Sequence, residues 1–148
     1  MSREKEYDVD QVIDTVGELL AAVAAFAAKV PAQAFVMSQS GMRMRPTEET
    51  IEGYENTVCR FRDRAGPMFR VLHSFFLDSL EAFEAGRVFD AVPPLLQAIE
   101  QLVALHKEEK VHYTPQQQNR IREFHRRLEK ILPETTKPEV DLPTPESY

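Results

Sequence analysis

Apolar residues recur along most of this chain at alternating steps of three and four, the spacing that gathers them on one face of an α-helix. The first such segment starts near Val9, with Asp8 or Asp10 as its expected cap, and closes at Pro31. Within it, Leu19 to Ala28 has no polar side chain, and a helix that is apolar all round must be covered on every side. We therefore expect a central core helix here. The alternative is that a second copy of the chain covers Leu19 to Ala28 in a homodimer.

A second helical pattern begins after Thr47, a good N-cap residue, and keeps its apolar register as far as Phe83. The dipeptide Gly66-Pro67 interrupts this pattern without shifting it, and a proline inside a helix clashes with the preceding turn. Because the register is preserved on both sides, the sequence favours a kink in one long helix over a reversal of chain direction. Gly86 is the expected C-cap.

Two further helical patterns complete the predicted body. One contains Pro93-Pro94 in its first turn, with Asp90 as the expected cap, and the other starts with Thr114 as cap and Pro115 at the first helical position. Residues 134–148 are rich in proline and acidic residues, and this composition predicts disorder. The sequence thus predicts an all-α bundle of four to five mostly antiparallel helices, with one domain over residues 1–133 and a disordered tail over 134–148.

Composition narrows the classes of function and location. A net charge of -6 disfavours a dedicated nucleic-acid binder, because neutralising phosphates requires concentrated Lys and Arg, although a local basic face is compatible with it. The single cysteine, Cys59, excludes an intrachain disulfide and fits a reducing compartment. The amino terminus resembles no secretory or transit leader, and the apolar stretch from Leu19 is shorter than the roughly 20 residues that cross a bilayer. We expect a cytoplasmic protein without a membrane partner.

The sequence offers little chemistry for catalysis or metal binding. Four histidines are present, and Glu109 with His112 forms one E-x-x-H pair, the spacing found in carboxylate-bridged di-iron bundles. Such a site needs a second pair, which the sequence lacks. The sequence also lacks a glycine-rich phosphate loop and a G-x-S-x-G elbow, and Cys59 beside Val58 is expected to be a small core residue. We therefore predict no catalytic residue, no metal and no cofactor.

Two surfaces are candidates for binding a partner protein. The first is a loop over residues 37–45, where flexible methionines alternate with arginines, a mixture that suits contact with an acidic surface. The alternative is that the methionines fold back on the core. The second is a basic stripe on the last helix, on the side away from its apolar residues. The alternative is that this side is an ordinary solvated face. The predicted partner-binding residues are Met42, Arg43, Met44 and Arg45 in the loop, and Arg122, Arg126, Arg127 and Lys130 in the stripe.

The last helix also carries Arg120 and His125 at R-x4-H spacing. This spacing resembles the ribonuclease motif of helical HEPN domains, in which the pair lies on a helix and cuts RNA at a dimer interface. Ile121 follows the arginine, where that family favours a polar residue. The expected function is a non-enzymatic protein-interaction module, such as an adaptor, a chaperone-like protein or an assembly subunit. The alternative is an RNA-binding or RNA-cleaving protein that uses the last helix.

Overall fold

The computed structural model describes residues 6–29 and 45–132, and this part of the chain is helical. Five α-helices and one 3₁₀ turn follow in order: α1 (Val9–Ala27), α3 (Glu48–Arg64), α4 (Leu72–Glu84), η1 (Val88–Ala91), α5 (Val92–Lys107) and α6 (Pro115–Ile131). The predicted all-α bundle is therefore confirmed. The predicted disorder over 134–148 and the Pro31 stop signal lie outside the described residues.

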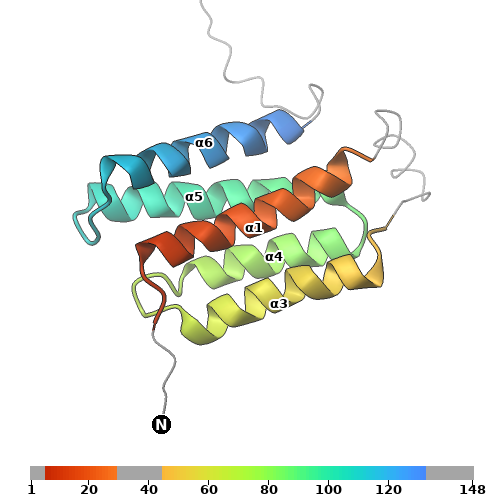
Figure 1. Ribbon diagram of the computed structural model, residues 1–148, viewed down its shortest axis with the longest axis horizontal. Helices are drawn as coiled ribbons and strands as arrows, with labels where there is room; N and C mark the ends of the chain where they lie inside the picture. Colours follow the sequence, from red (N-terminus) through yellow and green to blue (C-terminus); the bar gives the residue numbers. More distant parts are fainter. Residues whose placement is uncertain (1–5, 30–44, 133–148) are drawn as a thin grey trace, which may run out of the picture.

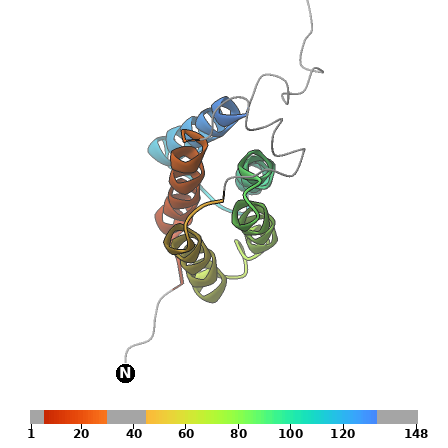
Figure 2. The ribbon, with the colours of Figure 1, turned by 90° about the vertical axis from the view of Figure 1, so that its right-hand side faces the viewer.

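The helices form two layers (Figures 1 and 2). One layer contains α6, α1 and α3, and the other contains α5 and α4, which nest against the first. Helices that follow one another from α3 to α6 run antiparallel, and so do α1 and α3, but α1 and α6 lie side by side and run in the same direction. Polar contacts between their first two turns hold this parallel pair: Gln117 Nε2 donates to Asp10 Oδ1 at 3.0 Å, and Arg120 Nη2 donates to Asp14 Oδ1 at 2.6 Å.

Several predicted helix ends are confirmed by their hydrogen bonds. The Asp8 carboxylate accepts from the Gln11 backbone N–H at 2.9 Å, and Thr114 does the same for Gln117 at 3.1 Å, each within a reciprocal capping box. These bonds satisfy backbone donors that a helix start leaves unpaired. Gly86 follows α4 with a φ of 81°, a left-handed conformation that glycine adopts without strain.

The expected cap Asp90 is wrong. Asp90 lies inside η1, and α5 starts after Ala91 without a side-chain cap. The Asp90 carboxylate instead lies 3.3 Å from the Arg87 guanidinium. The 3₁₀ turn η1 leads directly into α5, so the backbone is already helical where α5 begins. Pro93 and Pro94 lie in the first turn of α5, as predicted.

The predicted kink at Gly66-Pro67 is also wrong, because the chain reverses there (Figure 1). After α3 the backbone of Ala65 is extended, with φ -70° and ψ 135°, and α4 returns alongside α3. The register is preserved because both helices turn their apolar faces to one core. Phe61 meets Phe76 edge to face, with ring centroids 4.9 Å apart. A hairpin around a shared core and a kinked helix therefore produce the same apolar pattern.

The stretch Leu19 to Ala28 is central but not covered on every side. Its larger side chains are buried between α3, α5 and α6. Ala21, Ala25 and Ala28 are exposed in the part of the chain that the structure describes, so the predicted all-round cover is not seen there. Alanine tolerates this exposure because its single methyl group leaves little apolar surface in water. A homodimer through this strip stays a prediction.

One stretch, Val88–Lys107, is long and apolar enough to cross a membrane by length and composition. It comprises η1 and α5, and its buried side chains pack against α4, α6 and α1. A core helix passes the same test, so this result is weak evidence for a membrane span.

Candidate functional site

A groove lies between α5 and α6, two helices that pack antiparallel at one edge of the bundle (Figure 1). Its first hollow has a volume of about 230 Å³. A second hollow of about 380 Å³ adjoins it, since Ile99, Val103 and His125 line both. We call the two together the α5–α6 groove. Its remaining lining residues are His106, Tyr113, Gln118, Ile121 and Arg122 in the first hollow, and Glu100, Ala104 and Lys107 in the second.

The floor of the groove is apolar, and part of it is open to water. Ile99 and Ile121 are buried at 1% and 4% exposure, whereas Val103 between them is 38% exposed. The other large apolar side chains that are exposed in the described residues, Met68, Val71 and Leu77, lie on the α3–α4 connection and on α4. Among these exposed side chains Val103 alone lines the groove, and it does so where the two hollows meet. An exposed apolar side chain in a concave site is a natural contact for an incoming apolar group.

The wall nearest the 108–114 connection is held by stacked rings and hydrogen bonds. His106 stacks on Tyr113, with ring centroids 5.0 Å apart and an interplanar angle of 13°. The Tyr113 hydroxyl donates to the Leu102 carbonyl at 2.8 Å, and burial raises the pKa of Tyr113 to about 12. His106 Nδ1 lies 3.3 Å from the Val111 carbonyl, which can only accept, so Nδ1 carries the proton of this bond and Nε2 is left for a ligand. This end of the groove is preorganised.

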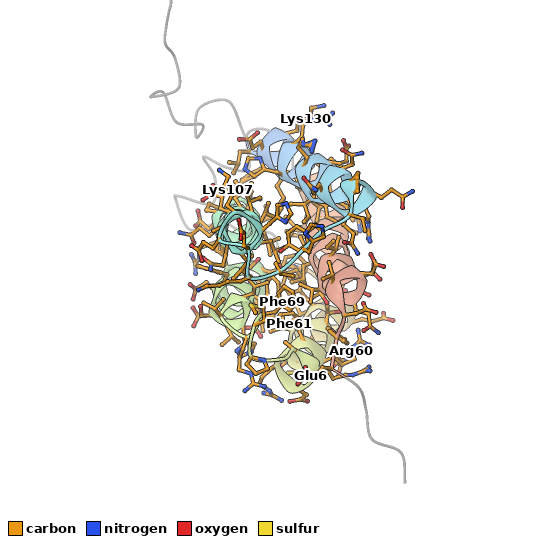
Figure 3. The ribbon with its side chains drawn as sticks, turned by 90° about the vertical axis from the view of Figure 1, so that its left-hand side faces the viewer. Glu6, Arg60, Phe61, Phe69, Lys107 and Lys130 are labelled. Atoms are coloured by element: carbon orange, nitrogen blue, oxygen red, sulfur yellow. The ribbon has the colours of Figure 1, made fainter. Side chains whose placement is uncertain are left out.

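Charged side chains of both signs stand along the rim of the groove. Because α5 and α6 are antiparallel, moving away from the 108–114 connection means descending along α5 and ascending along α6. Lys107 is therefore met first, and Glu100 and Arg122 follow at about the same level, each seven residues from the connection end of its helix. Glu129 lies further along α6, and its Oε1 is 3.7 Å from His125 Nδ1. Figure 3 looks at the bundle from the connection end and shows Lys107 on α5 at this corner, well apart from Phe61 and Phe69 in the interior near α3 and α4.

All four residues of the predicted basic stripe of α6 are exposed. Successive helical residues are rotated by about 100°, so the stripe spans about 140° around the axis, from Arg122 at one margin to Arg127 at the other. Arg122 lines the groove, whereas Arg127 lies on the opposite flank. Arg126 and Lys130 point outward between them, and Arg126 pairs with Glu123 at 2.7 Å.

The predicted Met/Arg loop falls largely outside the described residues, which include neither Met42, Arg43 nor Met44. Arg45 is described, and its Nε donates to the Glu84 carbonyl oxygen at 2.9 Å. A cation there complements the partial negative charge at the C-terminal end of α4. Arg45 therefore links the start of α3 to the end of α4.

Arg120 and His125 lie on different flanks of α6. Arg120 pairs with Asp14 on α1, and its guanidinium lies 5.7 Å from the centre of the Phe124 ring. His125 lines the groove beside α5. The R-x4-H spacing therefore brings the two side chains to no shared site in the described chain.

Other titratable groups form no metal site. Within residues 6–29 and 45–132, no group of three histidine, cysteine or acidic side chains is placed to hold a metal ion. His73 lies at the start of α4, where burial, helped by the nearby Arg62 guanidinium, lowers its pKa. Cys59 is half-buried and free.

Sequence reasoning missed most of the groove. The apolar pattern of residues 95–106 places Val103 on the same helix face as Leu102 and His106, which gives no sign that its side chain is exposed. The signal that separates Val103 is its place directly after Leu102, at the margin of the apolar face, where a side chain is half in the core and half on the surface. No protein-family model, curated protein or solved structure matches the chain.

Proposed function

We propose that the protein is a non-enzymatic protein-interaction module, of the adaptor, chaperone-like or assembly-subunit kind, that binds its partner through the α5–α6 groove. The observation that carries this proposal is the exposed Val103 between two adjoining hollows with charged rims. Protein interfaces commonly combine such a buried apolar centre with a polar rim.

The energetics of the groove suit binding better than catalysis. A partner side chain that enters the hollows removes Val103 from water and contacts the already buried Ile99 and Ile121. Each apolar anchor that fills such a pocket contributes about 2 kcal/mol or more to binding, which is about 30-fold in Kd. His106 contacts Tyr113 and Val111, and His125 contacts Glu129, so the described partners of these two histidines include no nucleophilic side chain.

The test compares the full chain with a groove variant and a matched variant outside the groove. Val103→Asp places a charge where the partner needs an apolar surface, and Arg127→Glu changes charge on the opposite flank of α6. Each protein is used to capture partners from its native cell extract, with quantitative mass spectrometry as the readout. We expect at least one protein to be lost about 30-fold or more with Val103→Asp and retained with Arg127→Glu.

Circular dichroism of both variants checks that the bundle is intact. If every captured protein is retained by a folded Val103→Asp variant, the groove is not the docking site. If RNA is recovered instead and is lost with Arg127→Glu, the RNA-directed alternative replaces the proposal.

A further inference from the structure

Two histidines stand in the apolar part of the α5–α6 groove. His106 of α5 and His125 of α6 both line the first hollow, together with Ile99, Val103 and Ile121. Both histidine side chains are half-buried. Histidine has an ordinary pKa of about 6.5, so these two rings can change charge near neutral pH, where the lysine, arginine and glutamate side chains of the groove do not.

The proton that charges His106 must go to Nε2. Its Nδ1 already carries a proton in the neutral ring, because it donates to the Val111 carbonyl at 3.3 Å. The side chains around this ring are cationic or can become so. Lys107 follows on α5, Arg122 of α6 lines the same hollow, and the His112 ring centroid is 5.8 Å from that of His106. A proton on Nε2 therefore adds a positive charge where none is balanced.

His125 has an acid nearby, but water screens it. Its Nδ1 lies 3.7 Å from Glu129 Oε1, and the Glu129 side chain is 57% exposed. An ion pair this exposed contributes little. The charges that α5 brings to His125 are Glu100 and Lys107 in the second hollow, which have opposite signs. Arg122, one turn earlier on α6, adds a second cation.

No further charge reaches the groove from the other elements in the described part of the chain. Within it, no side chain of α1, α3 or α4 lines either hollow, and neither do Glu108 and Glu109 of the 108–114 connection. The acids of α1 that contact α6, Asp10 and Asp14, pair with residues on its other flank. An apolar group in the first hollow therefore meets two rings whose charge depends on pH.

We propose that His106 and His125 make binding in the α5–α6 groove depend on pH, so that an apolar group is bound while both rings are neutral and is released when they take up protons. Filling the hollow removes water from the rings, and loss of water disfavours a charged imidazole. Binding and protonation oppose each other reciprocally, so acid weakens binding. This inference rests on the proposed function and adds the regulation of its site.

The first test needs no partner, because the protein can be made to cover its own groove. Val103→Phe enlarges the apolar side chain at the point where the two hollows meet. NMR follows the Cε1 proton of each histidine as the pH is lowered, in the wild type and in the variant. We expect His106 and His125 to need about tenfold more acid for protonation in the variant. His73 lies on α4, away from the groove, and should titrate equally in both.

Val103 is 38% exposed, so a larger side chain has room at this surface. Circular dichroism checks the fold, and Val103→Leu takes the place of Val103→Phe if the latter does not fold. If both groove histidines titrate at the same pH in the wild type and in the folded variant, this inference is wrong while the proposed function stands.

The second test uses proteins captured by the wild type at pH 7.5 and lost with Val103→Asp. A tenfold loss of proton affinity in one ring, from a pKa of about 6.5, makes binding about fivefold weaker at pH 5.5 than at pH 7.5. We expect a wash at pH 5.5 to release these proteins from the wild type and from the matched control His73→Gln. In the double variant His106→Gln with His125→Gln, the amounts bound at the two pH values should be nearly equal.

The outcomes separate this inference from the proposed function. Retention by the wild type at pH 5.5, or equal release from the double variant, would show that the two histidines do not control binding. If no captured protein depends on Val103, the use of the groove in the proposed function fails, and the NMR titration still shows whether filling the groove opposes protonation.

Discussion

Two glycines in helix interiors provide a matched test of how α1 packs on α6. Gly53 lies on the exposed side of α3, and a Cβ atom added there would meet nothing within 4 Å. A Cβ atom added at Gly17 in α1 would lie 2.9 Å from Cζ and 3.2 Å from Cε2 of Phe124 in α6. The optimal separation of two carbon atoms is about 3.5–4.0 Å, so Phe124 would have to move.

The expected energies of the two substitutions differ in sign. Glycine in a helix interior is less favourable than alanine by about 1 kcal/mol, so Gly53→Ala should stabilise the fold by that amount. Gly17→Ala gains the same backbone contribution, but overpacking costs about 1–3 kcal/mol. The net change in the free energy of unfolding should therefore lie between about zero and a loss of 2 kcal/mol.

Urea unfolding followed by circular dichroism measures both changes. The double variant Gly17→Ala with Phe124→Leu removes the ring edge that the new methyl group meets, and should recover stability relative to the sum of the single variants. If Gly17→Ala stabilises the protein as much as Gly53→Ala, the close packing of Phe124 of α6 on Gly17 of α1 is refuted.

Three further predictions concern buried or shifted polar groups. Ser79→Ala should lower the free energy of unfolding by about 2–4 kcal/mol in the same assay, because it leaves two buried groups without their hydrogen-bond partner. These groups are the Tyr54 hydroxyl, 2.5 Å from the Ser79 hydroxyl, and the Ala91 carbonyl, 2.7 Å from it. A loss below about 1 kcal/mol would contradict these hydrogen bonds. The pKa of His73 is lowered in the folded state, so the unfolded chain binds the proton first as pH falls below about 6.5, and the stability of the fold should decrease there. Urea midpoints at pH 7.5 and 5.5 measure this decrease, which should be smaller in His73→Gln. An equal decrease in the two proteins would contradict the lowered pKa of His73. The pKa of Tyr113 is raised to about 12, so in a spectrophotometric titration its hydroxyl should ionise well above the usual pKa of about 10. The stability of the fold should decline as pH rises past about 10, because the unfolded chain loses this proton first. If every tyrosine of the folded protein ionised near pH 10, the burial of Tyr113 would be contradicted.

The helices could be predicted from sequence because their signals are local. Asp8, Thr47, Thr114 and Gly86 act through hydrogen bonds or backbone conformations within a few residues, and each was confirmed at its helix end. The prediction that Asp90 caps α5 was wrong because Asp90 lies inside a 3₁₀ turn that precedes the helix, and the residue type alone does not indicate such a turn.

The path of the chain and the groove depend on contacts between distant residues. The apolar pattern around Gly66-Pro67 is the same for a kink and for a hairpin, so local periodicity has no information about direction. The groove combines Val103 of α5 with His125 of α6, and only the packing of the two helices makes them neighbours.

The parallel pairing of α1 and α6 has a consequence for the newly made chain. The Asp10–Gln117 and Asp14–Arg120 contacts join residues 107 and 106 positions apart. At translation rates of about 5–20 residues per second, α1 emerges roughly 5–20 s before α6. Until then the side of α1 at Gly17, which faces Phe124 of α6, has no native cover, whereas α3, η1 and α5 can cover the rest of the helix. Among the described helices, α1 is thus made before the others and completes its packing last, so part of its apolar side stays open to water in that interval.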